Sequence, residues 1–140
     1  MEIELIEKKK FKHASVYVVK DQGEVGLVKA TTTYIPFDQF KEIFAYIGEL
    51  TTKDKITKLV FDKSALSVFH QPSMEWYFLE WKEKMFDLGL KTHRKILPND
   101  EVFRQSVKIG REKIKKNHPN GKYTLMDIRY AESIEDAIAN

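Results

Sequence analysis

The stretch from Lys58 to Met74 constrains the fold of this chain more than any other part of the sequence. It begins with an apolar run that has the length of a buried strand, and this run stops at Asp62. A short connection then leads to Pro72 and Ser73, two residue types that favour the start of a helix. A buried strand followed directly by a helix is typical of a sheet that helices cover.

The residues before this stretch predict an antiparallel hairpin and a first helix. Residues 2–6 alternate charged and apolar side chains, while residues 13–19 and 24–30 are rich in valine and are separated by a turn sequence. A helix is predicted from Pro36 to about residues 50–52. Its apolar residues recur at steps of three and four and are Phe37, Phe40, Ile43, Phe44 and Ile47.

The residues after it repeat the helix and strand patterns. We predict a helix over 73–88, a short basic strand over 92–97 and a helix over 100–116. A strand over 123–128 and a short helix over 133–138 follow. The predicted buried residues of these helices are Met74, Phe78, Trp81, Met85, Leu88, Val102, Phe103, Val107, Ile114, Ile134, Ala137 and Ile138.

Strands that alternate with helices need crossover connections, and these make neighbouring strands parallel. We therefore predict a single α/β domain over residues 1–140. Its sheet is mixed, mostly parallel and begun by an antiparallel hairpin, and about four helices pack on it.

Several classes of functional site have no motif in the sequence. The chain has no cysteine, its four histidines lack metal-ligand spacing, and its six glycines form no phosphate-binding loop. We therefore predict no catalytic residue, no metal and no cofactor. The N-terminus has no signal-peptide pattern, and the longest charge-free run, Ser64–Met74, is shorter than the ~20 residues of a membrane span. These features favour a cytoplasmic protein without a transmembrane segment.

The apolar strand and the connection after it resemble the middle of a STAS domain, the fold of bacterial anti-sigma factor antagonists. Leu59-Val60-Phe61-Asp62 is similar to that family's strand and terminal acid, and Ala65-Leu66 and Val68-Phe69 stand at its small and apolar positions. The order of elements is similar to the SpoIIAA-like branch of the family. This resemblance implies a single STAS-like domain over residues 1–140 that acts as a regulatory, protein-binding module.

The phosphoacceptor motif of that family is not kept. His70, Gln71, Pro72 and Ser73 stand where the family has Asp, Ser, Ser and Gly, so the phosphoacceptor position falls on Pro72, which has no hydroxyl. Ser73 or Ser64 could take that role only in a different local register.

The connection between the buried strand and its helix is the first candidate site. It should lie at the carboxyl end of a parallel strand, where open α/β sheets tend to bind ligands, and beside the positive end of a helix. The candidate ligand- or partner-binding residues are Asp62, Ser64, His70, Gln71 and Ser73. The alternative is that these side chains only complete turns and helix caps.

The second candidate site is basic. Between Lys91 and Lys122 there are ten Lys and Arg residues against three acids, although the net charge of the whole chain is only +3. The candidates for an anionic partner lie on the predicted third helix and are Arg104, Lys108, Arg111 and Lys115. A helix face that is simply solvated explains the same pattern.

Three functions follow from these sites. The leading hypothesis is a non-catalytic binding or regulatory module that contacts a protein partner or a small ligand at the loop before Ser73. The alternative is a nucleic-acid or anionic-surface binder that uses the basic region, and the third is a small enzyme with Asp62 and His70 as acid–base residues. A homodimer could form through Trp76, Tyr77 and the hairpin.

Overall fold

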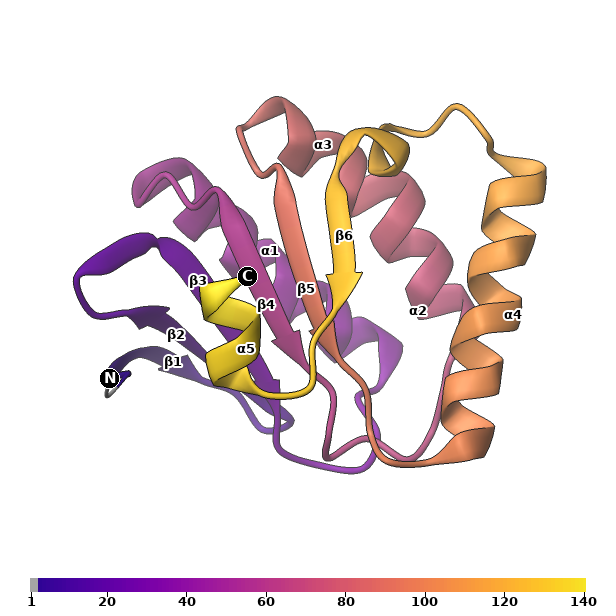
Figure 1. Cartoon of the computed structure of the whole chain (residues 1–140), viewed down its shortest axis with the longest axis horizontal. Helices are drawn as coiled ribbons and strands as arrows, with labels where there is room; N and C mark the ends of the chain where they lie inside the picture. Colours follow the sequence, from indigo (N-terminus) through magenta and orange to yellow (C-terminus); the bar gives the residue numbers. More distant parts are fainter. Residues whose placement is uncertain (1–2) are drawn as a thin grey trace.

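The computed structural model describes residues 3–140 (Figure 1). The strands are β1 (Leu5–Lys10), β2 (Ala14–Val19), β3 (Gln22–Ala30), β4 (Lys58–Asp62), β5 (Thr92–Ile96) and β6 (Asp127–Tyr130). The helices are α1 (Phe37–Lys53), α2 (Gln71–Trp76), α3 (Lys82–Asp87), α4 (Glu101–Asn117) and α5 (Ile134–Ala139). A π-helical turn (Tyr77–Trp81) joins α2 to α3, and a 3-10 turn (Lys122–Leu125) precedes β6.

The six strands form one sheet in the order β1-β2-β3-β4-β5-β6. The pairs β1–β2 and β2–β3 are antiparallel, whereas β3–β4, β4–β5 and β5–β6 are parallel. The predicted α/β class, with its opening hairpin and mixed sheet, is confirmed. The strand that ends at Asp62 lies inside the sheet, between β3 and β5.

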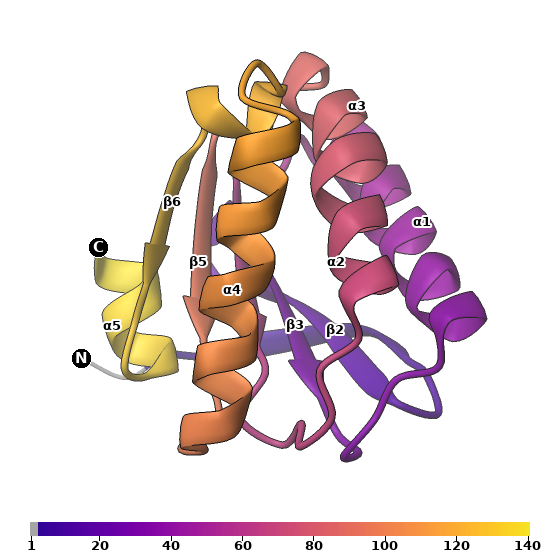
Figure 2. The same cartoon turned by 90° about the vertical axis from the view of Figure 1, so that its right-hand side faces the viewer.

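The layer arrangement follows from this strand order. From β3 to β6 each connection steps in the same direction across the sheet, and crossovers between parallel strands are almost always right-handed. The helices α1, α2, α3 and α4 therefore all lie on one face of the sheet (Figure 2). The helix α5 returns to the opposite face, where it contacts β4 and β5.

The main core lies between the sheet and α1–α4, and its centre is aromatic. The Phe44 ring is fully buried and lies 4.6 Å from the ring centroids of both Phe40 and Tyr77. The indole N–H of Trp81 donates to the Phe44 carbonyl at 2.7 Å and so ties the π-helical turn to α1. None of the helices in residues 3–140 has the length and apolar character needed to cross a membrane.

Two predicted strands differ from the structure. The strand predicted over 2–6 is found at Leu5–Lys10, and Glu2 lies outside the described residues. Because β1 is an edge strand, its charged residues face water and alternation is not required. The strand predicted over 123–128 begins only at Asp127, because the chain first turns to pack the Tyr123 ring 5.4 Å from that of Phe78.

Three side chains differ in burial from their predictions. Val102 was predicted to be buried but is 76% exposed, because the buried stripe of α4 runs through the next residue, Phe103. Leu88 is 49% exposed because α3 ends at Asp87. Tyr77 is fully buried, so it cannot contribute to the exposed aromatic surface on which the homodimer hypothesis rested.

A side-chain cap fixes the start of α4, and it provides a first prediction. The Asp100 carboxylate accepts a hydrogen bond from the Phe103 N–H at 3.1 Å. We expect Asp100→Ala to lower the free energy of unfolding by about 1 kcal/mol. Urea denaturation measures the loss. The matched control is Asn99→Ala, one exposed residue earlier, and an equal effect of both substitutions would contradict the capping role.

Candidate functional site

A cluster of buried cations lies between β5, the α2–α3 segment and α4. Lys82 and Lys95 are fully buried, and Lys63 is 9% exposed. Within residues 3–140, the Nζ atoms of Lys82 and Lys95 have no hydrogen-bond partner. None of the three lysines forms a salt bridge with any acid in the same range. We call Lys63, Lys82, Lys95 and Arg111 the cation cluster.

The π-helical turn carries Lys82 into the core. The backbone N–H of Lys82 donates to the Tyr77 carbonyl, five residues earlier, so the turn is one residue wider than an α-helical turn. Tyr77, Phe78, Trp81 and Lys82 are all buried as a result. Single π-helical turns of this kind occur frequently at functional sites.

The strand β5 supplies Lys95 from the other side. In a strand, alternate residues share a face, so His93 and Lys95 both point toward the helices α1–α4. The imidazole of His93 is fully buried and hydrogen-bonds the Tyr77 hydroxyl, with Nε2 at 2.8 Å. His93 therefore completes a polar layer beside the cation cluster.

Aromatic rings are the nearest compensation for the two lysine charges. The Nζ atoms of Lys82 and Lys95 lie 3.6 Å and 4.3 Å from the centroid of the Phe78 ring. A desolvated cation–π contact contributes about 2 kcal/mol. Removing an ammonium group from water costs several kcal/mol, so the ring alone does not offset burial.

Burial and mutual repulsion shift the protonation of the cluster. Burial, and then the Arg111 guanidinium, lower the pKa of Lys63 to about 8. Burial also lowers the pKa values of Lys82 and Lys95 well below their ordinary value, and the neighbouring cations add to this effect. The pKa of His93 is lowered well below its usual range by burial and then by the same lysines, so this imidazole is neutral.

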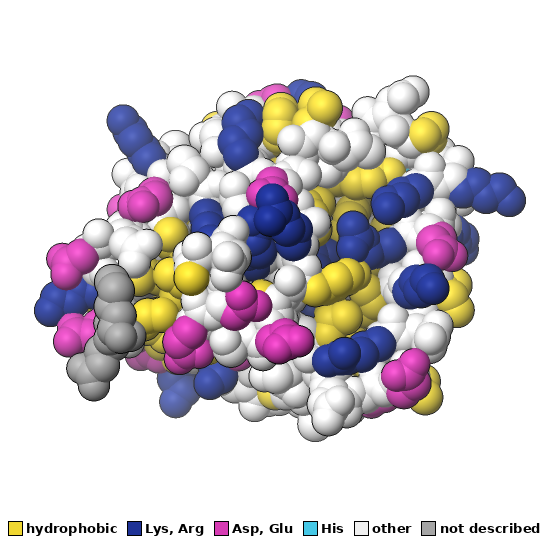
Figure 3. Space-filling model, in the orientation of Figure 1, with side chains coloured by type: hydrophobic (Ala, Val, Ile, Leu, Met, Phe, Trp, Pro, Cys, Tyr) yellow, Lys and Arg dark blue, Asp and Glu magenta, His cyan; other side chains and the backbone are white. Residues whose placement is uncertain are grey.

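Arg111 connects the cluster to a surface cavity of about 800 Å³ between α4 and the end of β6. Its guanidinium carbon lies 6.0 Å from the Phe78 centroid and 5.4 Å from the Tyr130 centroid, and Nη1 donates to the Tyr130 hydroxyl at 2.8 Å. Figure 3 shows Lys and Arg side chains around a hollow with apolar patches between α4 and β6. The cavity is lined by Leu97, Arg104, Gln105, Lys108, Arg111, Glu112, Lys115, Tyr130, Ala131 and Glu132.

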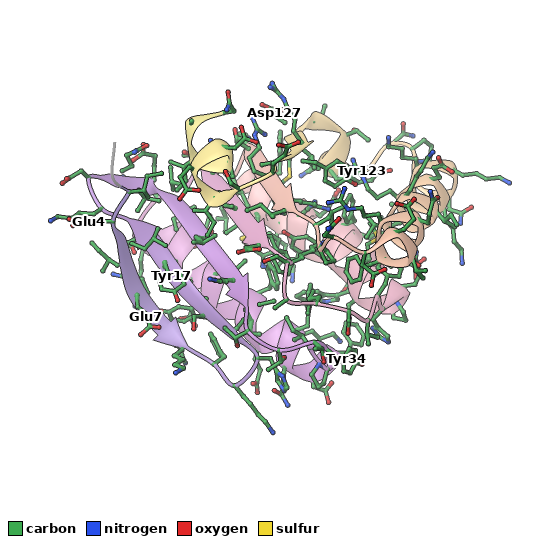
Figure 4. The ribbon with its side chains drawn as sticks, turned by 60° about the horizontal axis from the view of Figure 1, so that its bottom comes forward. Glu4, Glu7, Tyr17, Tyr34, Tyr123 and Asp127 are labelled. Atoms are coloured by element: carbon green, nitrogen blue, oxygen red, sulfur yellow. The ribbon has the colours of Figure 1, made fainter. Side chains whose placement is uncertain are left out.

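The opposite face of the sheet shows how this protein balances a buried cation. Arg94 is only 2% exposed, yet its guanidinium lies 3.0 Å from the Asp127 carboxylate and also donates to the Asp127 carbonyl. Figure 4 shows Asp127 close to α5, away from Tyr123, which lies toward α4. Within residues 3–140, no carboxylate forms a salt bridge with a member of the cation cluster.

The predicted site after β4 divides into separate parts. Asp62 is buried and accepts hydrogen bonds from the N–H and hydroxyl of Ser64, at 3.0 Å and 2.6 Å. These contacts complete a turn. The strand order from β3 to β6 does not reverse, so the described part of the sheet has no topological switch point at this edge.

His70 and Ser73 do lie together, at a small cavity of about 50 Å³ that Lys63 also lines. The helix begins at Gln71, and His70 caps it instead of Ser73: Nδ1 accepts from the Ser73 N–H at 3.3 Å and lies 2.7 Å from the Ser73 hydroxyl. Asp62 does not line this cavity. Gln71 packs instead against α4 at Gly110, where a Cβ would collide with its amide.

The four predicted basic residues of α4 lie together. Arg104, Lys108, Arg111 and Lys115 follow one another at steps of four, three and four, which places them on one helix face. All four line the cavity between α4 and β6. Whether they bind an anion stays a prediction.

Sequence reasoning missed the buried members of the cluster, although two signals pointed to them. A strand inside a parallel sheet is usually apolar, whereas β5 contains three consecutive basic residues, His93, Arg94 and Lys95. Lys82 follows Trp81 directly and lies four residues after Phe78, on the apolar stripe of its helix. Neither Lys82 nor Lys95 was among the predicted site residues.

Among the described residues, no group of three or more His, Asp or Glu side chains could hold a metal ion. Comparisons of the chain with protein-family models, with curated proteins and with solved structures find no match. The resemblance to STAS domains therefore stays a prediction.

Proposed function

We propose that the protein binds a small anionic ligand in the cavity between α4 and β6. The buried members of the cation cluster would lie on the core side of this ligand, next to Arg111. One observation carries this proposal: Lys82 and Lys95 are completely buried and have no counter-charge in residues 3–140. Burying an ammonium group without a partner costs several kcal/mol or forces the amine to lose its proton, and an anion that entered the cluster would stabilise the charged form.

The cavity has the size and lining that a small molecule requires. Ligand pockets usually enclose about 300–1,000 Å³, and this cavity lies within that range. Its lining combines four basic side chains with the apolar Leu97 and the Tyr130 ring, and only two acids, Glu112 and Glu132, oppose them. Arg111 offers a planar guanidinium, which suits a carboxylate or phosphate.

A concave site distinguishes this proposal from the alternative of a nucleic-acid or anionic-surface binder. A duplex or a membrane surface needs basic side chains that project outward along a broad face. Arg104, Lys108, Arg111 and Lys115 instead border a hollow, with Tyr130 on its other side. We therefore favour a small anion as the partner of these residues.

The wider role that we propose is that of a STAS-like binding or regulatory module. The surface around His70–Ser73 remains a candidate contact for a partner protein within this proposal. Lys63 lines the small cavity there and belongs to the cation cluster. An anion bound beside the cation cluster would therefore change the electrostatic potential at the His70–Ser73 surface as well.

Titration with inorganic phosphate in a chloride buffer tests the ligand class. We expect saturable binding by isothermal titration calorimetry, and a melting temperature that rises with phosphate concentration. Arg111→Gln should weaken binding about tenfold or more, because a charge-assisted hydrogen bond contributes about 1.5–3 kcal/mol.

The matched control is Lys116→Gln, an exposed lysine of the same helix that does not line the cavity, and its affinity should be unchanged. Equal effects of both substitutions would show general charge attraction instead of a site. Retention of duplex DNA that depends steeply on salt, without any phosphate binding, would favour the nucleic-acid alternative.

A further inference from the structure

Two buried amines lie next to each other beneath the proposed ligand site, and anion binding alone does not require this arrangement. Lys82 and Lys95 approach the same ring, Phe78, from α3 and from β5. Surface Lys and Arg residues of α4 already supply positive charge at the cavity. A primary amine offers what a guanidinium does not, namely a nitrogen that can lose its proton and attack a carbonyl carbon.

The surroundings of the two amines differ, and the difference assigns a role to each. Burial lowers the pKa of Lys95, and Lys82, Lys63 and Arg111 lower it further. Burial, Lys63 and Arg111 also lower the pKa of Lys82, but the nearby Lys95 amine acts in the opposite direction. Leu97, two residues after Lys95 along the same chain segment, lines the cavity, whereas no residue of α3 lines it. We therefore assign the attack to Lys95 and the proton transfer to Lys82, which lies beside it at the Phe78 ring.

We infer that the Lys95 ε-amine forms an imine with a small anion that carries an aldehyde or ketone group. This inference rests on the proposed function, because the ligand enters by the same cavity. The anionic group of the ligand pairs with Arg111, while its carbonyl carbon reaches Lys95 beside Phe78. Desolvated lysines next to a second cation are a known form of activated nucleophile.

The step balances without any oxidant or reductant. The Lys95 nitrogen lone pair forms a bond to the carbonyl carbon, and the electron pair of the C=O π bond moves to oxygen, which takes a proton from the Lys82 ammonium. The Lys95 nitrogen returns one proton to Lys82, which gives a carbinolamine. The hydroxyl departs as water with a proton from the Lys82 ammonium while the nitrogen lone pair forms the C=N bond, and the remaining N–H proton returns to Lys82. Amine and carbonyl thus yield imine and one water, and Lys82 is regenerated.

Arg111 lies between the cavity and the ring that both amines contact. Lys82 and Lys95 have no exposed surface, whereas Arg111 lies between the Phe78 and Tyr130 rings and lines the cavity. In the inferred reaction the ligand passes Arg111 on its way to Lys95, and the Arg111 guanidinium then leaves the Tyr130 hydroxyl. An anion is the group best able to draw the guanidinium away.

Reductive trapping tests the inference. The full-length protein is incubated with pyruvate or with glycolaldehyde phosphate in the presence of cyanoborohydride, and the adducts are mapped by peptide mass spectrometry. The two probes distinguish a carboxylate from a phosphate as the anionic group. We expect one reduced adduct per chain on Lys95, formed at least about tenfold faster than on any exposed lysine.

Substitutions separate the two roles. Lys95→Met should abolish the adduct, and Lys82→Met should slow its formation about a hundredfold and shift the pH profile, since a positioned proton donor contributes about that much. Lys84→Met, an exposed lysine of the same helix, should leave the rate unchanged. An adduct on Lys82, or adducts spread evenly over the exposed lysines, would overturn the assignment to Lys95.

The phosphate titration keeps this inference separate from the proposed function. Phosphate binding without any trapped adduct overturns the imine and leaves the anion site intact. Absence of both binding and adduct removes both proposals. Peptide mapping of the unsubstituted protein shows whether the adduct forms on Lys95 even if a variant fails to fold.

Discussion

Replacing Lys82 or Lys95 with methionine is expected to stabilise the protein by about 1–4 kcal/mol for each substitution. Both amines are fully buried, and neither has a hydrogen-bond partner in the described part of the chain. Methionine keeps much of the side-chain length and its contacts with Phe78 but removes the group that must be desolvated. Urea denaturation at pH 7 in a chloride buffer measures the change.

The matched control for this prediction is Lys84→Met, two residues after Lys82 on the same helix. Lys84 is exposed, so its replacement should change stability by no more than about 0.5 kcal/mol. If Lys82→Met or Lys95→Met instead lost several kcal/mol, the ammonium group would have a stabilising partner and the proposed anion site would be wrong. Stabilising variants that also lose phosphate binding would show the exchange of stability for function that is common at binding sites.

The free energy of unfolding is expected to rise with pH between pH 7 and 9.5. The pKa of Lys63 is about 8 in the folded protein against an ordinary value of 10.5, and burial also lowers the pKa values of Lys82 and Lys95. Between its folded and unfolded pKa, each lysine binds a proton only in the unfolded chain. Stability therefore rises with pH in that window, which for Lys63 runs from about 8 to 10.5, and it is lost as the pH falls.

For each lysine with a lowered pKa, the free energy of unfolding can rise by at most about 1.4 kcal/mol per pH unit. Lys63→Met, Lys82→Met and Lys95→Met should each flatten the profile, whereas Lys84→Met should leave it unchanged. Urea titrations at half-unit intervals below the ordinary tyrosine pKa of 10.0 provide the measurement. A stability that is constant or falls over this range would mean that the buried amines keep their ordinary pKa values.

The sequence by itself determined the class of the fold and the order of its elements. Apolar residues recur every two residues in a strand and every three to four residues in a helix. Both spacings are local patterns that indicate which face of the strand or helix is buried. Phe40 and Phe44, predicted from their helical spacing, and Phe61, predicted from its apolar run, all lie in the core. The four basic residues of α4 were also found from their spacing, because a helix face is a local property.

The tertiary structure alone decided which charges are buried. The positions of Lys82 and Lys95 depend on the π-helical turn, which carries Lys82 inward and places the Phe78 ring over Lys95. Desolvation arises from atoms that are distant in sequence, so a local pattern can indicate that a lysine lies on a buried face but not which groups surround it. Asp62 and His70 illustrate the converse: neighbours along the chain were expected at one site, but the turn after β4 gave each its own hydrogen bonds.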